Sequence, residues 1–128
     1  MSIIKKLPYN KYKQFVECEW EIEYLPVGFA LHDTFEAGEI KFFEYVDDEG
    51  VTIDFSYVPS IAATYIDNTD RIYSVIIENG NTYYLFTSEV ADEENVVIWD
   101  MNGYRFKVAS LYSIDELTKI AFSVKTVY

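Results

Sequence analysis

A nucleophilic site of the serine or cysteine type needs a base within hydrogen-bond reach of the nucleophile, and this sequence contains one histidine. His32 precedes Asp33, whose carboxylate is of the kind that orients an imidazole ring. Because adjacent side chains on an extended chain point to opposite faces, we expect His32 to lie at or near the surface. The single cysteine, Cys18, has no histidine or basic neighbour in sequence, so we expect a small half-buried residue. The sequence therefore predicts no nucleophilic catalytic site.

Carboxylates are the second possible source of chemistry, because 22 acidic residues accompany 10 basic ones. A glycoside hydrolase needs two carboxyl groups, one with a raised pKa, and no pair here is singled out by an apolar setting. The acidic runs 47–50 and 67–70 offer oxygen ligands for calcium but lack the spacing and terminal glutamate of a helix-loop-helix site, so we expect solvated turns. The five scattered glycines form no phosphate-binding loop. We expect no metal and no cofactor.

The charge of the chain limits its partners. A formal net charge of −12 repels phosphate backbones and anionic lipid surfaces, so we expect no nucleic acid and instead a protein or a neutral or basic ligand. No apolar run approaches the roughly 20 residues that span a bilayer, and residues 1–6 are not followed by the apolar core of a signal peptide. We expect one domain over residues 1–128, with no membrane insertion by this chain. The oligomeric state stays open.

The strongest structural signal is a hairpin within residues 96–108. The pair Asn102-Gly103 tolerates the positive φ angles of a type I′ turn, and a two-residue turn fixes the register of the strands on either side. One face of the hairpin is then apolar and the other is mixed. The expected cross-strand pairs are Met101 with Tyr104, Trp99 with Phe106, Val97 with Val108 and Asp100 with Arg105.

A helix is expected directly after this hairpin. Ser113 and Glu116 have the spacing of a capping box, in which the serine side chain accepts a hydrogen bond from the backbone of the glutamate. The apolar residues that follow recur at helical spacing, so one face of the helix packs on a sheet. Those residues are Leu117, Ile120, Ala121 and Val124.

The rest of the chain reads mostly as strands joined by turns. Residues 1–18 favour a short N-terminal helix, whereas alternating or apolar runs predict strands at 19–24, 39–46, 51–57, 61–66, 72–78 and 82–88. The last two strands join through Asn79-Gly80-Asn81, which leaves their register open by one position. We expect an α+β fold, with a twisted, largely antiparallel sheet built from hairpins and covered on one face by the C-terminal helix. The alternative is a nearly closed barrel plugged by that helix.

Aromatic residues are unusually frequent, with 12 tyrosines, nine phenylalanines and two tryptophans. Most are expected to be core and cross-strand partners, but those on strands 72–78 and 82–88 cannot all point toward the helix. If one sheet face is uncovered, these rings form a binding patch beside the acidic loop 89–95. The candidate binding surface is Tyr73, Tyr83, Tyr84, Phe86, Asp92, Glu93 and Glu94.

Four stretches, taken in order, resemble a bacterial family of domains of unknown function numbered 4367. The likeness covers roughly residues 20–125. It implies no catalytic residues. It also implies an extracytoplasmic domain in Gram-positive bacteria, often behind a transmembrane helix or an anti-sigma-like zinc-binding segment, and neither attachment occurs in this chain. The stretches are Tyr24-Leu25-Pro26-Val27-Gly28-Phe29, Asn79-Gly80 before an aromatic strand, the hairpin 97–106 and the capped helix 111–121.

Two functions of different class follow from these observations. The first is a non-catalytic binding or sensory module of a bacterial signalling or cell-envelope protein. The second is a small carboxylate-dependent hydrolase, and a pure assembly domain that pairs through an exposed edge strand is a further alternative. An enzyme should show a cleft with convergent acidic groups of perturbed pKa, whereas a module should show a shallow aromatic face. The sequence favours the binding module.

Overall fold

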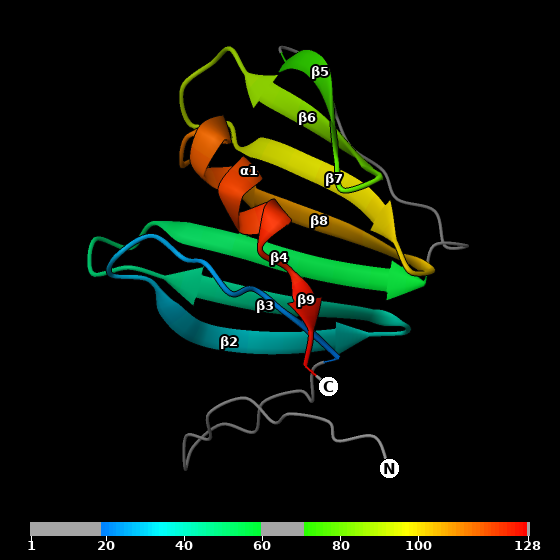
Figure 1. The fold of residues 1–128 in the computed structure, drawn as a ribbon. Helices are drawn as coiled ribbons and strands as arrows, with labels where there is room; N and C mark the ends of the chain where they lie inside the picture. The colour runs from blue at the N-terminus through cyan, green and yellow to red at the C-terminus, as the bar shows by residue number, and fades with distance from the viewer. Residues whose placement is uncertain (1–18, 60–70, 128) are drawn as a thin grey trace, which may run out of the picture.

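The computed structural model describes residues 19–59 and 71–127, which form an antiparallel sheet with a helix on one face (Figure 1). The sheet has seven strands in the order β2-β3-β4-β8-β7-β6-β5, and β1 pairs with β9 apart from it. This confirms the α+β fold with the C-terminal helix on the sheet. The elements are β1 (Trp20–Glu21), β2 (Ala30–Ala37), β3 (Ile40–Val46), β4 (Thr52–Pro59), β5 (Arg71–Glu78), β6 (Asn81–Ser88), β7 (Asn95–Met101), β8 (Tyr104–Ser110), α1 (Ile114–Phe122) and β9 (Lys125–Thr126).

The sheet consists of two hairpin series that meet at its centre. Strands β2, β3 and β4 follow one another in space as in sequence, and so do β5, β6, β7 and β8. Antiparallel pairing of β4 with β8, from Ile53 with Ser110 to Pro59 with Tyr104, joins the two series. Among the described strands, β2 and β5 are the edges and do not pair with each other, so these strands form an open sheet and not the barrel of the alternative prediction.

Two asparagine-glycine turns set the register of the hairpins. Asn102 and Gly103 have φ angles of 51° and 82°, which are the positive values that a type I′ turn requires. The predicted partners follow, including Trp99 with Phe106 and Asp100 with Arg105. The register that the sequence left open is also fixed, because the turn uses Asn79-Gly80 and pairs Glu78 with Asn81.

The helix α1 begins directly after Ser113, the N-terminal capping residue that the sequence predicted. The Ser113 Oγ accepts a hydrogen bond from the Glu116 N–H at 3.2 Å. The Glu116 carboxylate accepts a hydrogen bond from the Tyr24 hydroxyl at 2.7 Å, a partner that local sequence rules do not provide. Leu117 and Ile120 are fully buried, so α1 docks on the sheet through the predicted apolar stripe.

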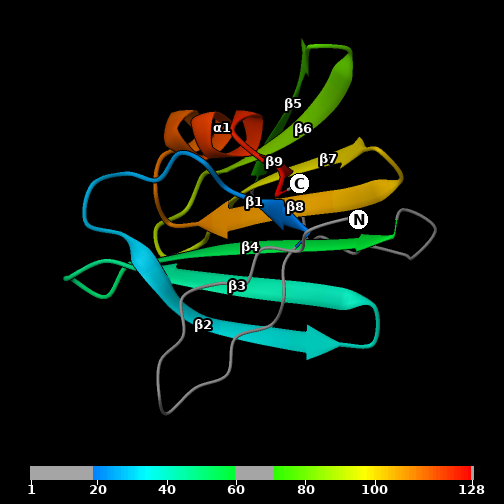
Figure 2. The same cartoon turned by 60° about the horizontal axis from the view of Figure 1, so that its bottom comes forward.

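The main core lies between the sheet and α1, and the β1–β9 pair packs at the same side (Figures 1 and 2). Alternate residues of the central strands point into it, as expected for a sheet with one covered face. Aromatic rings fill much of the space, and the Trp99 and Phe106 rings stack with centroids 5.2 Å apart. The largest fully buried side chains are Trp99, Phe43, Phe55, Phe106, Ile53, Leu117, Ile120, Val97 and Val108.

One predicted strand is shorter than expected, one strand was not predicted, and two predicted elements lie outside the described residues. The strand predicted at 19–24 is reduced to Trp20–Glu21, because it pairs with the short β9 and not with the main sheet. The strand β2 was not predicted, since its charged residues and a register shift between Leu31 and Asp33 disturb the alternation. The predicted N-terminal helix at 1–18 and the strand at 61–66 lie outside the described residues.

Candidate binding face

The candidate site lies on the face of the seven-stranded sheet that points away from α1, which we call the open face. Both α1 and the β1–β9 pair lie on the opposite side of the sheet (Figures 1 and 2). Because side chains alternate along a strand, residues next to the buried Trp99 and Phe106, such as Ile98 and Lys107, point to the open face. Within residues 19–59 and 71–127, no element covers this face.

Three of the predicted aromatic residues meet on the open face. The Tyr73 ring stacks on the Tyr84 ring with centroids 6.2 Å apart and planes at 12°, and its centroid lies 5.3 Å from that of Phe86. Tyr73 is 55% exposed and Tyr84 is 38% exposed, whereas Phe86 is buried beneath them. We call Tyr73, Tyr84 and Phe86 the aromatic triad. It lines a shallow pocket of about 250 Å³ together with Ile98, Trp99, Asp100 and Arg105.

The wall of this pocket contains an ion pair. The Arg105 guanidinium donates hydrogen bonds from Nε and Nη2 to the Asp100 carboxylate at 2.8 and 3.0 Å. These bonds are the main reason why the pKa of Asp100 is lowered from its ordinary value. Because the two charges offset each other, the pocket presents an aromatic surface with a neutralised polar edge.

The fourth predicted aromatic residue, Tyr83, does not belong to the open face. It follows the alternation of β6 and points into the core, where its ring lies 5.3 Å from Trp99 and 4.8 Å from Phe122. Burial raises the pKa of Tyr83 above its ordinary value. Adjacent residues of a strand cannot share a face, so Tyr83 and Tyr84 could not both lie on the open face.

The acidic loop between β6 and β7 is tied to the start of β5. The Arg71 Nε and Nη2 donate hydrogen bonds to the Glu94 backbone carbonyl at 3.2 and 3.1 Å. The Arg71 Nε also lies 3.8 Å from Glu93 Oε1, which accepts a hydrogen bond from the Ser88 hydroxyl. Asp92 has a φ of 65° in the turn itself. The predicted acidic residues Asp92, Glu93 and Glu94 therefore lie near one end of the aromatic triad, the end at which Tyr73 and Phe86 are located.

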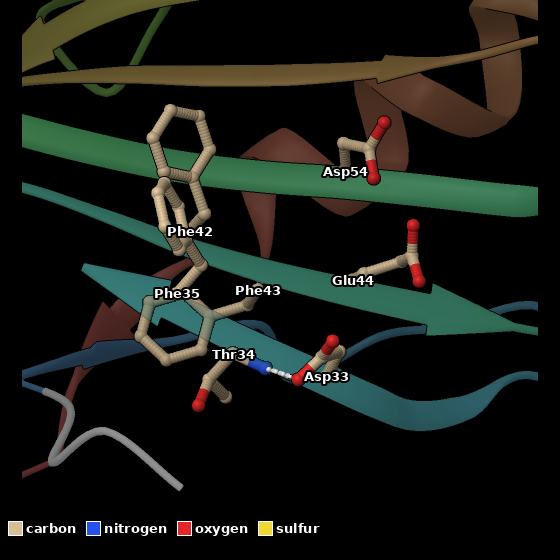
Figure 3. Close-up of a pocket in the computed structure, with 7 residues that line it drawn as sticks. All are labelled: Asp33, Thr34, Phe35, Phe42, Phe43, Glu44 and Asp54. Atoms are coloured by element: carbon tan, nitrogen blue, oxygen red, sulfur yellow. Dashed lines mark hydrogen bonds between the residues drawn. The ribbon is translucent and has the colours of Figure 1, made fainter. Parts of the chain in front are cut away.

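A second pocket on the open face, which the sequence did not predict, occupies about 290 Å³ over β2, β3 and β4. Cross-strand register aligns Asp33 with Glu44 and Glu44 with Asp54, so three carboxylates form a row across neighbouring strands (Figure 3). The Phe35 and Phe42 rings, with centroids 5.7 Å apart, form its aromatic part. We call this the acidic pocket.

Asp54 is the most perturbed group of the acidic pocket. Burial raises its pKa to about 6, the charges of Glu94 and Glu44 act in the same direction, and Lys107 opposes them. Part of the acidic loop is therefore electrostatically coupled to this pocket. Such a row can attract a cationic group or supply a carboxylic acid near neutral pH. Among the described residues, no group of three or more His, Cys, Asp or Glu side chains is arranged to hold a metal ion.

The signal for the acidic pocket was weak in the sequence. The alternation of residues 51–57 placed Ile53 and Phe55 on one face, which implies that Asp54 lies on the other. The register shift in β2 conceals how Asp33 aligns with Glu44. His32, on the same strand, is exposed at the surface, as expected.

Comparison with known proteins gives one finding. A family model described as a domain of unknown function (DUF4367) matches residues 19–124. No curated protein and no solved structure matches the chain. Within residues 19–59 and 71–127, no helix is long and apolar enough to cross a membrane.

Proposed function

Because the chain belongs to the family described as a domain of unknown function (DUF4367), whose description assigns no activity, we propose a function from the open face itself: the protein is a non-catalytic binding module for a neutral or basic protein partner. The observation that carries this proposal is the aromatic triad, with its exposed Tyr73 and Tyr84 rings, on a sheet face that no described element covers. Tyrosine provides a large contact area with little side-chain entropy to lose, which is why it is frequent at recognition surfaces.

The size of the triad pocket favours a macromolecular partner. Pockets for drug-sized ligands have volumes of roughly 300 to 1,000 Å³ and bury most of the ligand. The triad pocket holds about 250 Å³ and is shallow, so it fits one apolar side chain of a larger partner. An anchor residue in such a pocket, with neighbouring contacts that exclude water, is the usual arrangement at protein interfaces.

The electrostatic field favours a partner without excess negative charge. The chain carries a net charge of −12, and the acidic loop lies beside the triad. Opposite charge on the partner accelerates the encounter, and like charge slows it. A neutral or basic protein segment therefore approaches the open face more readily than nucleic acid or an anionic envelope polymer.

The experiment compares proteins captured from an extract of the source organism by the wild-type chain and by the double variant Tyr73→Ala/Tyr84→Ala. The matched control is Tyr24→Ala, because Tyr24 and Tyr84 are both 38% exposed but Tyr24 contacts α1. The proposal predicts a protein that is captured by the wild type and by the control but lost with the double variant. Equal capture by all three chains, or an anionic polymer as the tight ligand, contradicts it.

We further propose that the module serves bacterial signalling at the cell envelope, as an anti-sigma-like sensory domain. The support is the sequence resemblance to a family whose domains often lie outside the membrane. The test uses a tagged full-length protein expressed in the source organism. The cell wall is removed or made permeable while the membrane stays intact, and protease added outside should cleave the domain. Complete protection of the domain, with cleavage of a known surface protein, contradicts this location.

A second candidate function is a carboxylate-dependent hydrolase centred on the acidic pocket. Two observations favour it, the row of Asp33, Glu44 and Asp54 and the pKa of Asp54 near 6. A carboxylic acid with such a pKa can act as a general acid near neutral pH. Hydrolysis of a panel of glycoside and ester substrates is the test. Activity that Asp54→Asn abolishes and that the surface control Asp48→Asn retains would establish this function in place of the module.

A further inference from the structure

The two edges of the described sheet differ in how they are protected. Natural edge strands avoid pairing with other chains by means of charged side chains, proline, bulges or short length. The strand β2 has such features, with His32, Asp33 and Glu36 along its length and a register shift near its start. The strand β5 pairs with β6 over eight residues without interruption and has charges only at its ends, Arg71 and Glu78. Among the described strands, the edge at β5 therefore lacks the features that protect β2 from pairing.

Most side chains of β5 between its charged ends are apolar, and exposed ones occur on both faces. Tyr73, Val75 and Ile77 project on the open face, and Ile77 is 71% exposed. Ile72, on the opposite face, is also exposed, whereas Ile76 packs against the main core. Such exposure at a sheet edge is unusual for a strand without a further neighbour.

The turn that joins β5 to β6 determines which backbone groups of β5 are directed outward. In a hairpin with a two-residue turn the closing pair is a hydrogen-bonded pair, and here that pair is Glu78 with Asn81. Counted back from Glu78, the backbone N–H and C=O groups of every second residue of β5 therefore point toward β6. The N–H and C=O groups of Tyr73, Val75 and Ile77 point away from β6. These residues also carry the exposed side chains of the open face.

We propose that an extended segment of a basic protein partner adds to the β5 edge as a further antiparallel strand, with apolar residues at alternate positions and lysine or arginine at its ends. This inference rests on the proposed function and specifies how the partner binds. The added strand would extend the open face beside Tyr73, so its alternate side chains would contact the aromatic triad. Glu78 at one end of β5 and the acidic loop 92–94 at the other attract its basic ends.

A second copy of this chain fits the same edge less well. In antiparallel pairing, residues opposite each other share a face. The odd-numbered residues of β5 all lie on the open face, so in a two-fold dimer they lie opposite odd-numbered residues of the second copy. Arg71 of one copy can then never lie opposite Glu78 of the other. A dimer centred on Val75 instead pairs Ile72 with Glu78 on one face. Each copy also carries a net charge of −12, which opposes their approach.

The test uses the full-length protein and three synthetic peptides. The first peptide alternates threonine and valine between terminal lysines, the second has terminal glutamates, and the third has a proline at its centre. NMR hydrogen exchange is measured with and without each peptide. The lysine-flanked peptide should slow exchange of the Tyr73, Val75 and Ile77 amides by about tenfold or more, because they gain hydrogen-bond partners. The other two peptides should bind at least about tenfold more weakly.

Variants of β5 separate strand addition from contact with the open face alone. Val75→Pro removes one outward N–H while leaving the hydrogen bonds to β6, so it should weaken peptide binding by about tenfold. Val75→Thr keeps that N–H and should bind like the wild type. Should Val75→Pro unfold, Ile77→Pro serves instead, because Ile77 also directs its N–H away from β6 and the position is highly exposed.

Several outcomes of these measurements would overturn strand addition at β5. Binding that Tyr84→Ala weakens but Val75→Pro does not, without protection of the β5 amides, overturns strand addition and leaves the proposed function intact. A dimer in sedimentation experiments that Val75→Pro dissociates overturns it in favour of a second copy. Equal binding of the glutamate-flanked peptide, or no binding of the lysine-flanked one, also overturns it.

Discussion

The Tyr73 ring lies almost parallel to the Tyr84 ring, with their centroids 6.2 Å apart, across the edge strand β5 and its neighbour β6. The two residues are not directly opposite, because Tyr73 pairs with Phe86 and Tyr84 pairs with Val75. The stacking is therefore a diagonal contact on the open face. It positions two half-exposed rings beside the buried Phe86.

Removing one of these rings should shorten the lifetime of a complex. We expect Tyr84→Ala to raise the dissociation rate by roughly tenfold and to change the association rate little, because anchor residues act mainly on dissociation. Surface plasmon resonance with the captured partner is the measurement, and Tyr24→Ala is the control of equal exposure. Phe86→Ala is a less specific variant, since Phe86 is only 8% exposed and its loss also leaves a cavity. An unchanged dissociation rate in Tyr84→Ala would remove the triad from the interface.

Neutralising the acidic loop should affect the encounter instead. We expect Asp92→Asn/Glu94→Gln to slow association at low salt, with a smaller effect at high salt, because exposed charges act through a screened field. Glu93 is left in place, since it lies near Arg71 and accepts a hydrogen bond from Ser88. Binding kinetics at two ionic strengths provide the measurement. A variant that alters only dissociation would show that the loop makes direct contacts.

The turn at Gly103 should tolerate only residues that accept a positive φ. Gly103 has a φ of 82°, which is costly for a β-branched side chain. We expect Gly103→Val to lower the free energy of unfolding by about 1 to 3 kcal/mol. Gly103→Asn should cost less, because asparagine visits this region more readily. Thermal denaturation of both variants is the check, and equal melting temperatures for Gly103→Val and the wild type would argue against the type I′ turn.

The docking of α1 should depend on its buried stripe. Leu117 and Ile120 are both fully buried, so Leu117→Ala and Ile120→Ala should each lower the free energy of unfolding by about 2 to 5 kcal/mol. Lys119→Ala, on the exposed side of the same helix, should cost about 0.5 kcal/mol or less, since its ion pair with Glu116 is exposed. Urea denaturation measures all three. Similar losses at all three positions would mean that helix propensity, not packing, is responsible.

Ionised Asp54 should destabilise the fold. Burial, with help from Glu94 and Glu44, raises its pKa to about 6, above its value in the unfolded chain. The folded chain therefore binds a proton more readily, and stability from this group falls as the pH rises through about 6. Asp54→Asn should raise the melting temperature well above pH 6, and this gain should disappear below about pH 4. Asp48→Asn, at an exposed turn, should show no such dependence on pH. A constant gain at every pH would exclude the charge as its cause.

Local signals in the sequence accounted for much of the fold. The hairpin at Asn102-Gly103, the hairpin of β3 and β4, and the start of α1 at Ser113 depend on turn and capping residues within a few positions. The strand β2 and the short pairing of Trp20–Glu21 with Lys125–Thr126 depend on distant partners. Propensity does not contain that information, because a strand is defined by its neighbours.

In the candidate site, too, some features follow from local sequence signals and others depend on distant strand partners. The sequence placed Tyr73, Tyr84 and Phe86 on neighbouring strands, but only the fixed register showed that Tyr83 points to the core. The acidic pocket required the alignment of three strands, and the register shift in β2 falls beside one of its carboxylates. Side chains that converge through tertiary pairing leave little trace in sequence spacing.

The pairing of β4 with β8 also has a consequence for the folding rate. The Ser110 hydroxyl donates a hydrogen bond to the Thr52 carbonyl at 2.6 Å, between residues 58 positions apart. Each hairpin series can form from local contacts, but the part of the core that the two series share, including the stacked Phe55 and Phe106 rings, forms only when these two strands meet. Closing so long a loop costs conformational entropy before burial of the core compensates for it, so the pairing of β4 with β8 is a late and cooperative step. We therefore expect a transition state in which the centre of the sheet is formed, and folding in milliseconds to seconds.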